Sequence, residues 1–305
     1  MTKLNNLEDK YWSGLEKIVI FGFGRQGKKM YPTLNRDFDI VAIVDNSSEK
    51  QGKQVDGHTI LSFDQAEDFL HQYKIIVTTS QYYYQMIREQ LYSVGLTENI
   101  DFVMYQQFVT EWYYKYRNKI NVLKTDISLT TLCTLNCENC MQFLPYWEKG
   151  RRKENSLEEI KENVDIYFKC VDYLLDLDIV GGEPFLYSDL RKFIIYMGEK
   201  YRGRIGYVGF ITNGMIVPED DILELLKEYS MDVSISDYSE DIDYKHKIDQ
   251  ICEKLEKYKI SYMRNKHIDW FDFGFPKNRY LYEGEDAVRH MQCCNSIEHI
   301  LDDKK

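Results

Sequence analysis

Three cysteines stand close together in this sequence, where Cys133, Cys137 and Cys140 have the spacing C-x3-C-x2-C. Thiolates are strong ligands for zinc and for iron-sulfur clusters, and three of them in one loop can bind three irons of a cubane. Because no fourth cysteine lies nearby, one iron would be open to an exogenous ligand, which indicates chemistry. The alternatives are a zinc site completed by a distant cysteine or histidine, and three incidental thiols.

A second motif, Gly181, Gly182, Glu183 and Pro184, follows the apolar segment 177–180. The two glycines permit positive φ and a close backbone approach, while the proline ends the predicted strand. The carboxylate of Glu183 offers an anionic acceptor to an ammonium group. Alone the motif would predict only a turn, but one βα unit after the cysteines we expect it to be functional.

Together the two motifs resemble the radical S-adenosylmethionine (SAM) superfamily, in which C-x3-C-x2-C follows the first barrel strand. The resemblance implies that the three cysteines hold a [4Fe-4S] cluster whose open iron is chelated by SAM, and that the Gly-Gly-Glu-Pro element binds the SAM amino group. It also implies a flavodoxin or ferredoxin-type reductant. SAM would then be cleaved to methionine and a 5'-deoxyadenosyl radical, which abstracts hydrogen from a substrate.

Two further resemblances concern later strand ends. Thr212, Asn213 and Gly214 look like a Thr-Asn-Gly turn that is common in the family, and Asn213 is expected to contact SAM. Ser236 lies where family members contact the SAM ribose, although it could equally be a polar residue alternating along a strand.

The cysteine loop departs from the family pattern at one position. The residue before the third cysteine is usually aromatic and touches adenine, whereas here it is Asn139. We expect Phe143 or Tyr146 to supply that contact. The loop otherwise resembles radical SAM proteins that have a Rossmann-like N-terminal domain and occur with polysaccharide-type gene sets, which favours a carbohydrate or nucleotide-sugar substrate over a peptide.

The pattern of the N-terminal part predicts a strand at 17–22, a glycine turn, a helix at 26–34 and a second strand at 39–44. The residues predicted to bind a nucleotide there are Gly22, Gly24, Gly27 and Asp45. A helix N-terminus suits a phosphate, and the acid follows the second strand as in dinucleotide-binding units. A degenerate module used only for packing is the alternative.

Alternating strands and helices predict an α/β protein with two domains. Residues 1–118 are expected to form a Rossmann-like doubly wound sheet, and residues 119–305 a partial (β/α)6 radical SAM barrel. Strands are predicted at 122–130, 177–180, 205–212, 231–236 and 259–263, and helices at 188–200, 219–229 and 242–257. Ser156 and Glu159 form a capping box for another helix, whose apolar spacing continues to Leu175.

The remaining cysteines have separate interpretations. Cys170 and Cys252 fall in helical patterns and are predicted to be buried. Cys293 and Cys294 resemble the start of an auxiliary-cluster extension of the SPASM or twitch type from about residue 288, which we expect to be incomplete at Lys305. Two thiols without metal are the alternative.

Composition limits the partners. The net charge is -11, so nucleic acid is a poor partner. No signal peptide or membrane segment is evident, and odd cysteine usage favours a reducing, cytoplasmic location. The basic residues near Arg152 could receive an acidic electron carrier or be solvated loop. The rival functions are a non-catalytic iron-sulfur or zinc scaffold and a nucleotide-binding regulatory protein.

Overall fold

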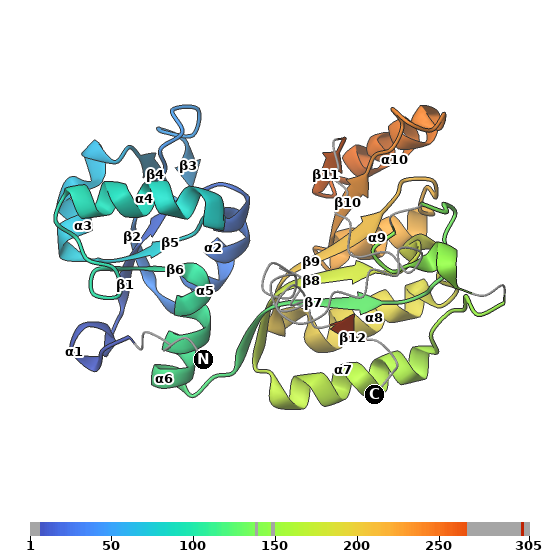
Figure 1. Cartoon of the computed structure of the whole chain (residues 1–305), viewed down its shortest axis with the longest axis horizontal. Helices are drawn as coiled ribbons and strands as arrows, with labels where there is room; N and C mark the ends of the chain where they lie inside the picture. The colour runs from blue at the N-terminus through green and yellow to red at the C-terminus, as the bar shows by residue number, and fades with distance from the viewer. Residues whose placement is uncertain (1–6, 138–139, 148–149, 267–299, 302–305) are drawn as a thin grey trace, which may run out of the picture. The chain divides into compact units, whose positions relative to one another are not determined.

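The computed structural model describes residues 7–137, 140–147, 150–266 and 300–301. Contacts between residues divide the chain into two compact units, one formed by residues 1–123 with 170–175 and the other by residues 124–169 with 176–305. Each unit contains a largely parallel sheet with helices packed against it (Figure 1). The prediction of an α/β protein with parallel sheets is therefore confirmed.

The sheet of the N-terminal unit has the strand order β3-β4-β2-β1-β5-β6, in which only the β3–β4 pair is antiparallel among the described strands. Its strands are β1 Lys17–Phe21, β2 Asp39–Val44, β3 Gln54–Val55, β4 His58–Leu61, β5 Lys74–Val77 and β6 Phe102–Met104. Its helices are α1 Asp9–Trp12, α2 Arg25–Asp37, α3 Glu67–Gln72, α4 Gln81–Ser93, α5 Tyr105–Gln107 and α6 Tyr113–Arg117.

The strand order reverses between β1 and β5, which are neighbours although β2, β3 and β4 lie between them in the chain. Because crossovers between parallel strands are right-handed, α2 and α4 must cover opposite faces of the sheet. Figure 1 shows α4 on the face toward the viewer. The parallel strands β4-β2-β1-β5-β6 have the order seen in dinucleotide-binding sheets. Nucleotide binding by this unit stays a prediction.

An aromatic cluster that the sequence patterns did not predict closes this unit. A π-helical turn, Phe108–Trp112, joins α5 to α6, and its rings stack with an interplanar angle of 26°. The indole of Trp112 donates to the carbonyl of Trp12, 2.9 Å away, and packs edge-on against Phe38. The cluster thereby ties the start of the unit to its end.

Gly27 of α2 lies against the backbone of the glycine turn that follows β1. An added Cβ would lie 2.1 Å from the carbonyl oxygen of Gly22, which itself has φ +103°. We expect Gly27→Ala to lower the free energy of unfolding by about 2 to 4 kcal/mol, because backbone must move. Urea unfolding followed by circular dichroism measures this. Gly24→Ala is the matched control, because the nearest atom to its added Cβ would be Lys50 Nζ, 3.7 Å away. Its free energy of unfolding should fall by less than about 1 kcal/mol.

The second unit has the strand order β11-β10-β9-β8-β7-β12. Its strands are β7 Asn121–Ser128, β8 Tyr173–Val180, β9 Ile205–Thr212, β10 Asp232–Ser236, β11 Tyr262–Asn265 and β12 Ile300–Leu301. Its helices are α7 Leu157–Cys170, α8 Leu190–Tyr201, α9 Asp220–Glu228 and α10 Lys245–Tyr258. From β7 to β11 each strand lies beside its predecessor, so right-handed crossovers place the helices on one face, as α7 and α8 show in Figure 1.

Two details of this unit correct the sequence predictions. Helix α7 ends at Cys170, so Val171 and Leu175 lie beyond it, and Leu175 belongs to β8. Their helical spacing was a coincidence, because buried strand residues can fall at the same intervals. Cys170 is exposed at the helix end rather than buried, whereas Cys252 is buried in α10 as predicted.

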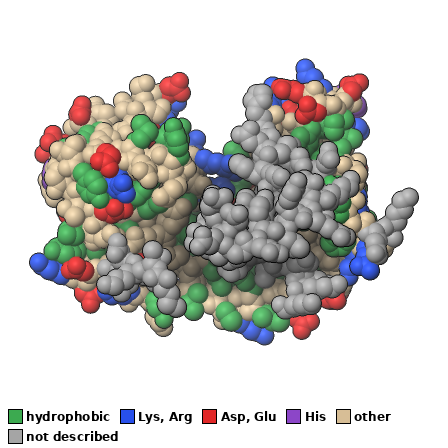
Figure 2. All heavy atoms as spheres, in the orientation of Figure 1, with side chains coloured by type: hydrophobic (Ala, Val, Ile, Leu, Met, Phe, Trp, Pro, Cys, Tyr) green, Lys and Arg blue, Asp and Glu red, His purple; other side chains and the backbone are tan. Residues whose placement is uncertain are grey.

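Figure 2 shows acidic, basic and hydrophobic side chains interspersed over the visible face of the N-terminal unit. No helix in the part of the chain that the structure describes combines the length and apolar character needed to span a membrane.

Candidate active site

The carboxyl ends of neighbouring parallel strands bring the predicted motifs to one edge of the second sheet. The cysteine loop follows β7, the Gly-Gly-Glu-Pro element follows β8, and Asn213 and Gly214 follow β9. This edge is where α/β sheets and βα barrels place their ligands, since side chains from several strands converge there. The predicted residues are therefore neighbours in space although they are far apart in sequence.

The two glycines let the β8 loop lie directly on the start of the cysteine loop. The amide of Gly182 donates to the carbonyl of Thr130 at 2.7 Å, and Glu183 N donates to Leu132 O at 2.8 Å. An added Cβ on Gly182 would lie 2.0 Å from Leu132 O, and Gly181 has φ +144°. Larger residues at either position would separate the two loops.

The carboxylate of Glu183 is fully buried, with 0% of the residue exposed. One oxygen accepts the hydroxyl of Thr212 at 2.8 Å and the amide of Phe185 at 3.2 Å, and the other accepts the amide of Asn213 at 2.9 Å. These donors belong to the chain itself and join β8 to β9. Direct contact between this carboxylate and the SAM ammonium group stays a prediction.

Burial raises the pKa of Glu183 to about 7, despite the three donors that favour its ionised form. Because the folded state holds the proton more tightly than the unfolded chain, stability is greatest below the unfolded pKa and is lost as pH rises toward 7. The free energy of unfolding should therefore fall by about 2 to 3 kcal/mol between pH 5 and pH 8. Urea unfolding of metal-free wild type and Glu183→Gln across this range measures it: only the wild type should show this decline, and parallel curves would contradict it.

The three cysteines are half-buried free thiols. The Cys133 sulfur accepts the amide of Leu135 at 3.4 Å and the side-chain amide of Asn213 at 3.6 Å. Burial raises the pKa of Cys133, and the charges of Glu183, Cys137 and Cys140 raise it further. The thiols are thus close enough to influence one another.

Within the described residues, no three side chains of histidine, cysteine, aspartate or glutamate converge as a ready-made metal site. Cysteines become thiolates when they bind a metal, and the raised pKa of Cys133 keeps its thiol neutral without one, so nothing draws the three sulfurs together in the metal-free chain. The donor set, three thiols on one loop at a strand-end edge, suits an iron-sulfur cluster. These residues fit the group that the resemblance implies.

Arg152 hydrogen-bonds to two residues of the cysteine loop. Its guanidinium donates to the carbonyl of Leu144 at 2.7 Å and to the side chain of Asn136 at 2.8 Å. Both acceptors lie between or just after the cysteines. Sequence reasoning placed Arg152 in a basic, solvated segment and missed this contact, because the pattern of charges carries no signal of a backbone acceptor.

Other side chains predicted to contact SAM are found in two places, the cysteine loop and the end of β10. Phe143 and Tyr146 are half-buried in the cysteine loop, where Phe143 has φ +54°. Ser236 ends β10 and hydrogen-bonds Tyr238, whose pKa is raised to about 12 chiefly by burial and also by the charges of Cys137 and Cys140. Asn139, Cys293 and Cys294 lie outside the described residues.

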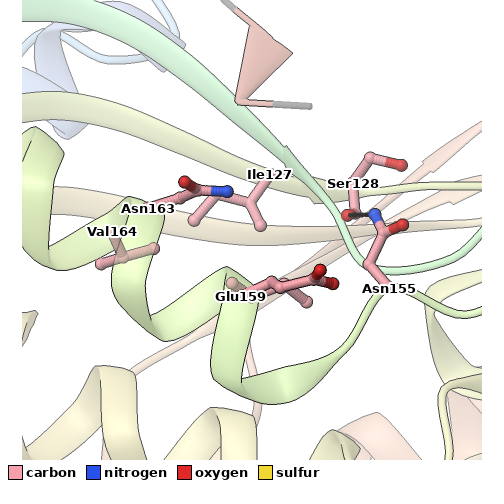
Figure 3. A pocket seen from close by; sticks show the side chains of 7 residues that line it. Ile127, Ser128, Asn155, Glu159, Asn163 and Val164 are labelled. Atoms are coloured by element: carbon pink, nitrogen blue, oxygen red, sulfur yellow. Dashed lines mark hydrogen bonds between the residues drawn. The ribbon is translucent and has the colours of Figure 1, made fainter. Parts of the chain in front are cut away.

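The second unit also contains a pocket (Figure 3). Its empty volume, which includes open solvent, is about 290 Å³, and its lining comes from the end of β7 and from α7. The amide of Asn155 donates to Ser128 O at 2.8 Å across its edge. None of the predicted site residues lines it.

The N-terminal unit holds the residues predicted for a nucleotide: Gly22, Gly24, Gly27 and Asp45. Gly24 directly precedes α2. Asp45 is 6% exposed, and its carboxylate accepts the amides of Phe23 at 2.6 Å and Ser47 at 2.8 Å and the ammonium of Lys50 at 3.0 Å. In this structure Asp45 thus braces the glycine turn, and ribose binding stays a prediction.

Comparison with known families assigns the second unit. Residues 127–269 match the family model described as the Radical SAM superfamily, and residues 14–100 match one described as C2185-like, N-terminal. The chain therefore carries a radical SAM domain. Members of this superfamily are generally enzymes, and the matching segment follows the one that is similar to the C2185-like, N-terminal family model.

A curated relative matches part of this chain. GTP 3',8-cyclase of Alkaliphilus oremlandii (strain OhILAs) is 34% identical over 114 residues, which are 37% of this chain and 33% of the relative. The chain thus matches about a third of that protein's length.

Solved structures show weaker likeness. Native anSMEcpe with bound AdoMet is 20% identical, with a TM-score of 0.36 over 47% of this chain and 43% of that one. Streptococcus suis SuiB bound to S-adenosylmethionine is 16% identical, with a TM-score of 0.32 over 71% and 58%. The assignment depends on the family model and not on these values.

Proposed function

We propose that this chain is a radical SAM enzyme that reductively cleaves SAM at a [4Fe-4S] cluster held by Cys133, Cys137 and Cys140. The observation that carries the proposal is the meeting of the cysteine loop with the Gly-Gly-Glu-Pro element, whose backbones are hydrogen-bonded at 2.7 and 2.8 Å. The match of residues 127–269 to the radical SAM family supports it.

When bound, the cluster supplies one-electron cleavage of SAM to methionine and a 5'-deoxyadenosyl radical, with the electron delivered by a flavodoxin or ferredoxin-type reductant. The chain's own part is to hold the three thiols and to shape the surface around them. Gly181 and Gly182 let the β8 loop pack directly against the start of the cysteine loop, and Pro184 begins the short turn that follows. Glu183 fixes this loop to the β9 end, and Ser236 and Tyr238 offer hydroxyls beside it.

The test is performed without oxygen. The protein is reconstituted with iron and sulfide, reduced with dithionite and given SAM, and 5'-deoxyadenosine is measured by mass spectrometry. Production supports the proposal. Absence with about four irons bound would indicate a non-catalytic cluster protein, and zinc in place of iron would indicate a structural site.

For the substrate we favour a carbohydrate or nucleotide-sugar. The glycine turn that precedes α2 in the N-terminal unit, and the nucleotide named for the curated relative, support this preference. A panel of nucleotide-sugars and of peptides, added to the same assay, should show which class raises 5'-deoxyadenosine formation above its rate without substrate. Stimulation by peptides alone would overturn the preference.

A further inference from the structure

The side chain of Asn213 points at the first cysteine of the cluster loop. Its Nδ2 lies 3.6 Å from the Cys133 sulfur and 3.1 Å from the Thr134 hydroxyl. Asn213 follows β9, so these contacts span 80 residues of sequence. The residue is 8% exposed, which means that its polar groups must be satisfied within the protein.

The orientation of this amide is fixed by the chain itself. Its Oδ1 accepts the backbone amide of Met215 at 2.9 Å, and a backbone N–H can only donate. The opposite end of the amide, the NH₂ group, must therefore face Cys133. A flipped amide would place a nitrogen against the Met215 donor and an oxygen against a thiolate, losing both interactions.

The backbone of Asn213 is held just as firmly. Its N–H donates to Glu183 at 2.9 Å, and its carbonyl accepts the hydroxyl of Tyr244 at 3.0 Å. Tyr244 is itself 2% exposed and accepts the amide of Tyr238 at 2.8 Å. The amide donor is thus mounted on a rigid junction between three strand ends, as a precisely placed hydrogen bond requires.

We infer that Asn213 is a positioning residue that donates a hydrogen bond to the sulfur of Cys133 and so tunes the cluster, rather than a direct ligand of SAM. The inference rests on the proposed function. A donor to a ligating sulfur stabilises the more negative, reduced state of a cluster and raises its reduction potential. The cluster would be harder to reduce without this donor.

The test measures the midpoint potential of the iron-loaded protein without SAM, by a redox titration followed by visible absorbance and electron paramagnetic resonance. Asn213→Ala removes the donor. Asn213→Asp keeps the shape and the acceptor for Met215 but replaces the donor by a negative oxygen. The midpoint potentials of both Asn213 variants should be more negative than that of the wild type, with the larger shift in Asn213→Asp. The midpoint potential of Thr134→Val should stay near that of the wild type.

Two results would overturn the inference. Wild-type potentials in both Asn213 variants, with weaker SAM binding, would assign Asn213 to SAM. An equal shift in Thr134→Val would assign the effect to loop packing and not to the N–H donor. If the wild type itself loads no iron, the proposed function fails instead, so the two failures are distinguishable. Should Asn213→Ala not fold, Asn213→Asp decides, because it is nearly isosteric.

Discussion

Replacing Cys137 with alanine should abolish both iron loading and 5'-deoxyadenosine formation. Two remaining thiols cannot hold three irons of a cubane, and no other cysteine of the described residues lies in the loop. Because Cys137 is half-buried on a loop, the fold should survive its truncation. Iron content after anaerobic reconstitution, the absorbance of the cluster and mass spectrometry of the products measure the effect.

Cys170→Ala is the matched control, since Cys170 is an exposed free thiol at the end of α7. It should bind iron and form 5'-deoxyadenosine as the wild type does. If Cys137→Ala keeps a full cluster and its activity, the three cysteines are not the cluster ligands. If Cys170→Ala loses iron as well, general damage to the protein explains the losses.

The local patterns of the sequence predicted most of the second sheet. The segment 205–212 coincides with β9, and one of the two hydrogen bonds of the predicted capping box of α7 is found, from the Glu159 amide to the Ser156 hydroxyl at 3.4 Å. Such features depend on neighbours in the chain, which a sequence shows directly. The α/β class followed from them.

Elements that depend on distant contacts were missed. The segment 105–117 is rich in aromatic residues with modest helix propensity, and its helices are stabilised by packing on Trp12 and Phe38. The β3–β4 pair was missed as well, because β3 has only two residues and carries little apolar pattern. Tertiary packing decides both, and no window of sequence contains it.

In the candidate site too, some features could be predicted from the sequence and others depend on tertiary contacts. The resemblance to the radical SAM family implied that Cys133 and Glu183 belong to one site, and the backbone hydrogen bonds between their loops agree with this. The burial of Glu183 and the contact between Asn213 and Cys133 could not be predicted, since they arise from the side-by-side order of β7, β8 and β9. The sequence motif is the same whether its carboxylate contacts a ligand or the backbone of the protein.

Replacing Glu183 with alanine should destabilise the second unit by about 3 to 5 kcal/mol. The change leaves three buried donors without their acceptor, namely Thr212 Oγ1, Asn213 N and Phe185 N. It also releases the β9 end from the β8 loop, so SAM affinity should fall even where the cluster assembles. Urea unfolding measures the first effect, and SAM titration of the iron-loaded protein measures the second.

Glu183→Gln separates shape from charge. Its amide oxygen can still accept the Asn213 amide, and its NH₂ group can donate to Thr212, whose hydroxyl can rotate to accept; only the Phe185 amide then lacks a partner. The loss should therefore be about half that of Glu183→Ala. Glu158→Ala, on the exposed side of α7, should change stability by less than about 0.5 kcal/mol. Wild-type stability in Glu183→Ala, with SAM binding lost, would show instead that this carboxylate meets the SAM ammonium group directly.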